Sequence, residues 1–395
     1  MKNVLLIVTG SIAAYKAADL CSMLKKSGMN INVIMTKNAT NFIHPTTFEA
    51  LTGNRCVIDS FDRNFEFKIG HISLAQSADI CVVAPASANI IGKLACGIAD
   101  DMASTTVMAT KAPVLIAPAM NTNMYQNPIV QDNISRLSGF GYSFISPASG
   151  RLACGDVGEG KLAAVEDIFE EIMLHIHHDH DLAGQKVLVT AGPTCEAIDP
   201  VRYITNHSTG KMGYALARAA ARRGAEVTLV SGRTSLKAPR GVSLISVLSA
   251  DDMAKAVLEG SGRQDIYIMA AAVADFTPTK VSDHKIKKGA AMPKLDFSPT
   301  TDILETIGKN RQGNEFICGF AMETEDLIDN ASAKLTKKNA DMICANSIRE
   351  AGSGFGTDTN RITLITHDET IKLDLMSKDE VSDAILDRII SIRKH

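Results

Sequence analysis

The residues best suited to chemistry lie in short glycine-rich or polar segments that follow apolar runs. Gly10-Ser11 ends the run VLLIVT, and main-chain N–H groups and a hydroxyl at such a turn can bind a phosphate. The turn lacks both the G-x-G-x-x-G fingerprint of dinucleotide sites and the G-x-x-x-x-G-K-[ST] loop of triphosphate sites. By itself it fits a phosphate site and a plain strand-to-helix turn equally well.

Three side chains could act on a substrate. Cys154 lies in the glycine-rich segment Gly150 to Leu162, whose composition is typical of a mobile flap, although most cysteines are buried and inert. His71 in GHIS can transfer protons, but a lone histidine is more often structural. Asn121 in PAMNTNM can donate an amide hydrogen bond to a substrate carboxylate.

Metal-binding side chains gather in the run His175 to His180 (HIHHDH). This run lies where a linker between domains is expected, and no second ligand cluster accompanies it, so we favour a linker over a metal site. The eight cysteines show no C-x-x-C spacing, which predicts reduced thiols.

Length and charge limit the classes of function. A chain of 395 residues exceeds what one hydrophobic core usually organises, which predicts two domains. A net charge of -3, without long single-sign runs, predicts small-molecule partners and neither nucleic-acid nor membrane binding. Met1 to Asn3 lead directly into a strand pattern without a secretory segment, so we expect a cytoplasmic protein.

The elements that position these residues alternate between strands and helices. Residues 4–9 and 31–36 are apolar strand patterns, and the helix between them repeats apolar residues at i, i+3, i+4 and i+7. These residues are Ala17, Leu20, Cys21 and Leu24, and Gly28 is expected to end the helix. The order predicts a right-handed βαβ unit.

The same order recurs at residues 186–232, with a helix expected from Gly210 to Arg223. The intervening loop, Pro193 to Thr209, is long and polar, which makes it a candidate active-site element. We therefore predict an α/β protein with two Rossmann-like domains, residues 1–180 and 181–395.

Further apolar runs end in chemically useful residues. VVAPAS (82–87), LIAPAM (115–120) and FISPAS (144–149) each place a proline at a strand end. Because the carboxyl ends of parallel strands line one crevice, Asn89, Asn121 and the loop after Gly150 should converge there. By the same argument, Asp275, Phe320 and Asn346 should face a second crevice.

Several segments resemble known enzyme families. In the first half, GSIAAYK, GHISLA, PASANIIGKLACGIADD, PAMNTNM and GRLACGDVGEG resemble flavin-dependent phosphopantothenoylcysteine decarboxylases. In the second half, TNHSTGKMG, AAVADF, KIKK and CANS resemble phosphopantothenate-cysteine ligases. The resemblance covers nearly the whole chain, in the order found in bacterial bifunctional coenzyme A biosynthesis proteins. It implies a flavoprotein-type parallel sheet in residues 1–180 and a nucleotide-binding ligase domain in 181–395.

For the first domain the resemblance implies an FMN-dependent decarboxylation. It places seven residues around FMN, with the phosphate at the first three: Gly10, Ser11, Ile12, Thr36, Ser87, Asn89 and Ser104. His71 corresponds to a catalytic histidine, Asn121 would hold the substrate carboxylate, and Cys154 would donate a proton. FMN would provide the electron sink that loss of CO2 from an ordinary amino-acid carboxylate requires.

For the second domain the resemblance implies that CTP activates 4'-phosphopantothenate as an acyl-cytidylate, which the amine of cysteine attacks. Asn206 and Lys285 would be catalytic, Asn206 by stabilising charge on the acyl carbonyl. The nucleotide-binding positions would be Asp275, Lys285, Asp302, Phe320, Lys334 and Lys338. Mg²⁺ is expected with the triphosphate, with ligands that spacing does not assign. Thr300-Thr301 replaces the Asn-Pro of many relatives, which weakens the assignment of that loop.

The resemblance also implies a homo-oligomer, a dodecamer built from trimers and dimers. Two other classes of protein share parts of this pattern. Non-catalytic relatives of the decarboxylase fold exist, but His71, Asn121 and Cys154 are all present here. A nicotinamide oxidoreductase would also show paired Rossmann-like domains, but the dinucleotide fingerprint is missing.

Overall fold

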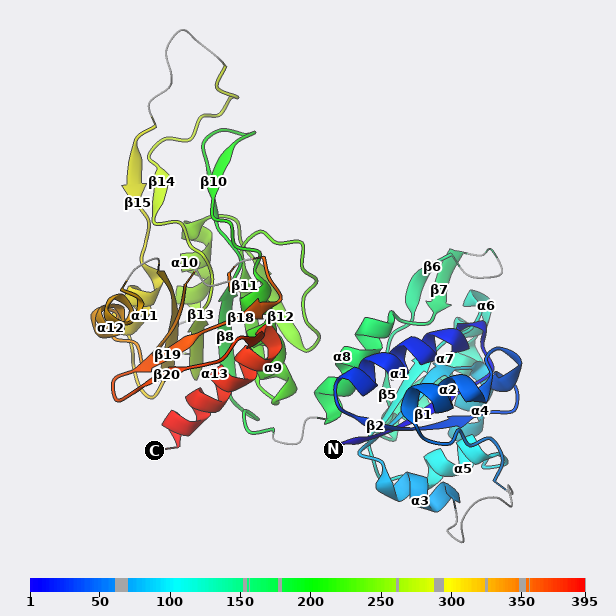
Figure 1. The fold of residues 1–395 in the computed structure, drawn as a ribbon. Helices are drawn as coiled ribbons and strands as arrows, with labels where there is room; N and C mark the ends of the chain where they lie inside the picture. The colour runs from blue at the N-terminus through cyan, green and yellow to red at the C-terminus, as the bar shows by residue number, and fades with distance from the viewer. Residues whose placement is uncertain are drawn as a thin grey trace. The chain divides into compact units, whose positions relative to one another are not determined.

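The computed structural model describes residues 1–60, 70–151, 155, 157–176, 180–260, 263–287, 295–323, 326–347, 353–354 and 356–394. The chain forms two compact units, Met1–His177 and His178–His395 (Figure 1). Within the described ranges, no helix has both the length and the apolar character needed to cross a membrane.

The first unit is built on a five-stranded parallel sheet, whose strand order is β2-β1-β3-β4-β5. The strands are β1 (Asn3–Val8), β2 (Asn30–Met35), β3 (Ile80–Ala86), β4 (Val114–Pro118) and β5 (Ser143–Phe144). The order reverses direction between β1 and β3, and in such sheets ligands bind at that switch point, beyond the carboxyl ends of the strands.

Helices cover both faces of this sheet. One apolar core joins it to α1 (Lys16–Lys26), α2 (Pro45–Thr52) and α8 (Val165–Ile176). The other joins it to α3 (Gly70–Ser77), α4 (Ala88–Ala95), α5 (Met102–Ala109) and α7 (Pro128–Gly139). Shorter elements are η1 (Ile12–Tyr15), η2 (Ala39–Asn41) and α6 (Thr122–Tyr125).

The expected first helix is confirmed as α1. Its buried residues are the four predicted ones, Ala17, Leu20, Cys21 and Leu24. β1 is apolar from Val4 to Val8 because helices cover both faces of the sheet. The expectation for residues 144–149 was wrong in part, since β5 ends at Phe144. The chain continues into a hairpin of β6 (Ala148–Arg151) and β7 (Val157–Lys161), because antiparallel pairing with β7 takes up this stretch.

The second unit contains an eight-stranded mixed sheet, in the order β12-β11-β8-β13-β16-β17-β19-β20. The first six strands run parallel, and β19 and β20 are antiparallel additions. Their bounds are β8 (Lys186–Ala191), β11 (Glu226–Ser231), β12 (Val242–Ser246), β13 (Ile266–Met269), β16 (Phe316–Glu323), β17 (Met342–Ser347), β19 (Thr363–Thr366) and β20 (Thr370–Lys372).

Two groups of helices flank this sheet. α9 (Lys211–Arg222) packs on β8 and β11 and against α13 (Lys378–Arg393), beside which it runs in Figure 1. α10 (Ala250–Glu259), α11 (Ile303–Lys309) and α12 (Leu327–Lys337) share an apolar core with the strands. Three small pairs complete the unit: β9 (Cys195–Ala197) with β10 (Tyr203–Thr205), β14 (Phe276–Pro278) with β15 (Phe297–Pro299), and β18 (Thr359–Asn360) with β21 (Met376–Ser377).

The start of α9 lies very close to the end of β8. A Cβ atom on Gly213 would lie 2.6 Å from Cβ of Ala191, so only glycine permits this approach. The polar loop Pro193 to Thr209 is more ordered than its sequence indicates, because it contains the β9–β10 hairpin.

Candidate active sites

The carboxyl ends of β1, β2 and β3 border a cavity of about 570 Å³, here called the switch-point cavity. Its lining includes six of the seven residues predicted around the flavin: Gly10, Ser11, Ile12, Thr36, Ser87 and Asn89. Lys93, Asp101 and Met120 also line this cavity. The topology therefore brings together residues from three separate sequence segments.

Hydrogen bonds fix the ends of β1 and β3 to each other. Thr9 Oγ1 donates to the Pro85 carbonyl at 2.7 Å and accepts from the Ser87 N–H at 2.9 Å. The chain then turns at Gly10, where a Cβ atom would lie 2.8 Å from Cβ of Asn38. This close approach keeps the first turn narrow and its main chain accessible to the cavity.

Ser104, the seventh predicted residue, does not line this cavity. It is fully buried in α5, and its hydroxyl lies 2.9 Å from Oδ1 of Asp101 within a capping box. Asp101 itself reaches the cavity and pairs with Lys93 at 2.7 Å. Ser104 therefore does not reach the cavity itself, but its hydroxyl bonds to the carboxylate of Asp101, which does.

The polar groups around the switch-point cavity suit a phosphate group and the polar edge of a flavin ring. Thr36 Oγ1 is buried there, and within the part of the chain that the structure describes it has no hydrogen-bond partner. A buried hydroxyl of this kind usually bonds to a ligand or water. Together with the accessible turn at Gly10-Ser11, it offers polar groups that FMN can satisfy.

A second cavity, about 360 Å³ and here called the side cavity, adjoins the first and shares Ser11, Ile12, Ala119 and Met120 with it. Asn121 lines it and caps α6 through Oδ1, which accepts from the Asn123 N–H at 2.8 Å. Three cations also line it, namely Lys16, Arg151 and Lys161. The side cavity therefore suits an anionic molecule placed next to the switch-point cavity.

The other predicted residues of the first unit lie elsewhere. His71 is half-buried on α3, which packs against α5, and it lines neither cavity. Cys154 lies outside the described residues. In the histidine run, His175 Nδ1 contacts the Glu171 carbonyl at 2.9 Å within α8, while 177–179 also fall outside the described residues. Where the chain is described, no group of three or more His, Cys, Asp or Glu side chains could hold a metal.

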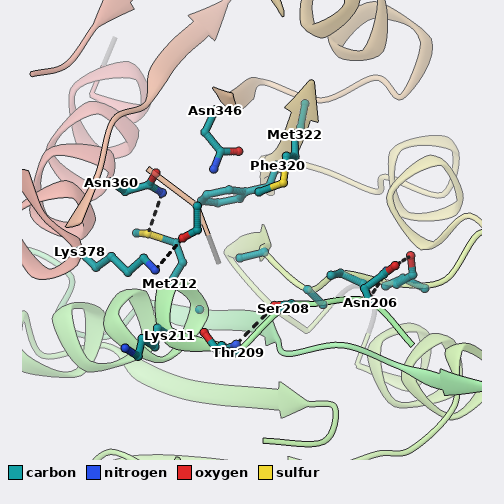
Figure 2. Close-up of a pocket in the computed structure, with 18 of the residues that line it drawn as sticks. Asn206, Ser208, Thr209, Lys211, Met212, Phe320, Met322, Asn346, Asn360 and Lys378 are labelled. Atoms are coloured by element: carbon teal, nitrogen blue, oxygen red, sulfur yellow. Dashed lines mark hydrogen bonds between the residues drawn. The ribbon is translucent and has the colours of Figure 1, made fainter. Parts of the chain in front are cut away.

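The second unit has a cavity of about 340 Å³, here called the C-terminal cavity (Figure 2). Residues 206–213, residues 270–273, and the ends of β16 and β17 surround it. Four predicted residues line it: Asn206, Asp275, Phe320 and Asn346. Asn206 Nδ2 donates to the Ala272 carbonyl at 3.0 Å, which fixes its amide at one end of the cavity.

Two lysines occupy the other end of this cavity. Lys211 pairs with Asp358 at 2.7 Å, and Lys378 Nζ donates to the Thr357 carbonyl at 2.6 Å. Burial, and then the nearby charge of Lys211, lower the pKa of Lys378 to about 8. No role was assigned to Lys378 from the sequence. The only local sequence feature at Lys378 is the capping box at the start of α13. Lys378 reaches the cavity because α13 packs on α9.

Three predicted nucleotide-binding residues do not line the C-terminal cavity. Lys338 Nζ lies 2.6 Å from carboxylate oxygens of both Asp302 and Glu305. Lys334 Nζ donates to the Phe320 carbonyl at 2.8 Å, behind the ring that lines the cavity. Lys334 therefore supports the main chain at Phe320, whereas Lys338 is held by Asp302 and Glu305.

Lys285 does not line the C-terminal cavity of its own chain either. It is exposed, on a segment held by a bond from the Ile286 N–H to Asp199 Oδ2 at 3.1 Å. Arg202 Nη2 donates to the Ile286 carbonyl at 2.9 Å from the same anchor. Of the KIKK motif, Lys288 is outside the described residues.

Comparison with known proteins covers both units. Residues 1–177 match the family model described as Flavoprotein, and residues 182–392 match the model described as DNA/pantothenate metabolism flavoprotein C-terminal domain. The chain is 49% identical to the coenzyme A biosynthesis bifunctional protein CoaBC of Bacillus subtilis (strain 168), over 100% of this chain and 98% of that one.

Two further relatives extend this picture. The CoaBC protein of Haemophilus influenzae (strain ATCC 51907 / DSM 11121 / KW20 / Rd) is 42% identical, over 98% of this chain and 97% of its own. A protein named cysteine/cysteine sulfinic acid decarboxylase, from an unknown prokaryotic organism, is 43% identical over 89% of this chain and 99% of its own.

Proposed function

Because the chain belongs to the family of bifunctional coenzyme A biosynthesis proteins, we propose that it performs two consecutive steps of that pathway. The second unit ligates cysteine to 4'-phosphopantothenate with CTP, and the first decarboxylates the product to 4'-phosphopantetheine. The observation that carries this proposal is the similarity over the entire chain, supported by a residue-lined cavity in each unit.

The ligation requires an activated carboxylate, since a carboxylate is a poor acylating agent. We assign Asn206, whose amide lies at one end of the C-terminal cavity, the role of donating to the acyl oxygen of the acyl-cytidylate as cysteine attacks. Asp275 lines the same cavity and offers a carboxylate of the type that Mg²⁺ prefers. Phe320 offers an aromatic face for the nucleotide, with Lys334 supporting its main chain.

The remaining nucleotide-binding positions do not line the C-terminal cavity, so we propose other roles for them. We assign Asp302 and Lys338, which form an ion pair and do not line the cavity, a structural role rather than direct contact with the nucleotide. Lys285 contributes to a site built with a second copy of the chain, since it lies away from the cavity of its own chain. The chain is accordingly proposed to act as a homo-oligomer. We also propose that it acts in the cytoplasm.

The decarboxylation is assigned to the two adjoining cavities of the first unit. FMN, held by Gly10, Ser11, Ile12, Thr36, Ser87 and Asn89, supplies a two-electron acceptor when bound. Asn121 donates to the cysteinyl carboxylate in the side cavity. Lys16, Arg151 and Lys161 attract the phosphate of the substrate.

Two roles rest on the resemblance alone. Cys154 is proposed as the proton donor that completes reduction of the product, and it lies in the segment between β6 and β7. His71 is proposed as a catalytic histidine. Because it lines neither cavity of its own chain, it would reach a site from a neighbouring copy.

One incubation tests the two activities. Purified protein is given 4'-phosphopantothenate, cysteine, Mg²⁺ and either CTP or ATP, and pyrophosphate, CO2 and phosphopantetheine are followed. We expect all three products with CTP, with pyrophosphate preceding CO2. The similarity to a cysteine decarboxylase adds a necessary arm with cysteine alone. CO2 release from cysteine without nucleotide would show that the first unit acts on free cysteine, which contradicts the proposed substrate.

A further inference from the structure

Two lysines from distant parts of the sequence meet in the second unit. Lys211 begins α9 and Lys378 begins α13. Both line the C-terminal cavity and also a neighbouring hollow of about 380 Å³, here called the outer hollow, so they stand between the two spaces. Figure 2 shows them at the end of the C-terminal cavity opposite Asn206.

One short segment of main chain holds both ammonium groups. Lys378 Nζ donates to the carbonyls of Gly354 at 3.1 Å and Thr357 at 2.6 Å. Lys211 Nζ donates to the Gly356 carbonyl at 3.0 Å and pairs with Asp358 at 2.7 Å. Carbonyl oxygens carry only partial negative charge, so these three bonds position the ammonium groups without supplying a full counter-charge.

This arrangement is costly for the protein by itself. Lys378 is only 6% exposed, and a buried cation is stable only when its charge is well compensated. The side chain of Asp358 is 91% exposed, and solvent weakens the attraction of such a carboxylate. Placing the charge of Lys211 nearby adds repulsion between the two ammonium groups. An anion bound between them would relieve both costs.

Other charges on this wall have the same sign. α9 and α13, of 12 and 16 residues, both begin here, and helix N-termini carry partial positive charge. Arg218 and Lys237 line the outer hollow, where Arg218 pairs with Asp379 at 2.7 Å. The lining of the outer hollow therefore includes four basic side chains and two carboxylates.

We propose that Lys211 and Lys378 form a phosphate subsite of the ligase, which binds a substrate phosphate while the reacting carboxylate lies near Asn206. This proposal rests on the ligase function proposed above. Phosphopantothenate carries its carboxylate and phosphate at opposite ends of the molecule, and the triphosphate of CTP extends away from the phosphorus atom that reacts. Both substrates therefore offer the required group at the required end.

Separate titrations of the two substrates identify the source of the phosphate. The full-length protein and its Lys378→Gln variant are titrated calorimetrically with CTP and Mg²⁺, and in parallel with 4'-phosphopantothenate. We expect Kd to rise about tenfold or more for one substrate, because charge-assisted bonds to phosphate are lost. A rise confined to phosphopantothenate assigns its phosphate to the subsite, and a rise confined to CTP assigns the triphosphate. Lys378→Arg should restore most of the affinity.

Matched variants separate binding from folding. Lys255→Gln on α10 removes the same charge from an exposed pair with Asp251 and should bind both substrates normally. If Lys378→Gln lowers Tm, Lys211→Gln replaces it, because that side chain is 33% exposed and its loss disturbs less packing.

Two results would overturn the subsite. One is a change in Kd below about twofold for both substrates in Lys378→Gln and Lys211→Gln. The other is equal weakening of both substrates that Lys378→Arg does not restore, which indicates a structural role. The underlying ligase function is checked independently, by pyrophosphate release from the wild-type protein.

Discussion

At the scale of single residues, Gly10 shows how one missing side chain shapes a site. We expect Gly10→Ala to displace the neighbouring turn, because its Cβ would lie 2.8 Å from Cβ of Asn38. The purified variant should lose bound flavin, measured by visible absorbance, while far-ultraviolet circular dichroism stays normal. Gly139→Ala is the matched control, since a Cβ there has no atom within 4 Å in the described structure. Full flavin retention by Gly10→Ala would disprove the assigned phosphate position.

Asn206 tests the ligase site at the same scale. Its amide is fixed by the Ala272 carbonyl at 3.0 Å, and one donor to a developing oxyanion contributes roughly 10²- to 10³-fold in kcat. We therefore expect Asn206→Ala to slow formation of 4'-phosphopantothenoylcysteine from the acyl-cytidylate by about that factor. Decarboxylation of added 4'-phosphopantothenoylcysteine by the same preparation should be unchanged. A parallel fall in both activities would show that the two sites are not independent.

At the scale of elements, an anchor at Asp199 holds the segment that carries Lys285. The bonds from Arg202 hold the pKa of Asp199 well below its ordinary value, and Asp199 Oδ2 also accepts from the Ile286 N–H. A carboxyl group with a lowered pKa stabilises the folded state above its unfolded pKa. This contribution is lost as the pH falls below about 4. The anchor should therefore be fully formed at neutral pH.

Removing this anchor should free the segment. We expect Asp199→Asn to increase tryptic cleavage after Lys285 and Lys287 under native conditions, followed by mass spectrometry, and to lower ligase activity without loss of flavin. Asp251→Asn, which breaks an exposed pair with Lys255, is the control of equal charge. Unchanged cleavage in Asp199→Asn would show that other contacts hold the segment.

At the scale of the whole molecule, the proposed role of His71 requires a site shared between two copies of the chain, because His71 lines neither cavity of its own chain. If a neighbouring copy supplies His71, mixed oligomers of His71→Asn and Asn121→Ala chains should contain some sites with both native residues. We expect co-expression of the two inactive variants to restore measurable CO2 release. Each variant expressed alone serves as the control. No recovery in verified mixed oligomers would contradict a shared site.

Much of the architecture follows from local sequence. The buried face of α1 could be predicted, as could the placement of Asn89 just after β3 and of Phe320 on β16, because apolar periodicity and parallel pairing depend on nearby residues. Less could be predicted where one stretch of sequence can pair with more than one strand. Residues 144–149 read as one strand, yet pairing with β7 divides them between β5 and a hairpin.

The sequence by itself determined two α/β halves, their order, and six of the residues that line the switch-point cavity. Only the tertiary structure decided that Ser104 stands behind Asp101, that His71 lies away from both cavities of the first unit, and that Lys378 meets Lys211. The physical reason is that such contacts join segments far apart in the chain. Their geometry depends on how helices pack on the sheets, which local periodicity does not encode.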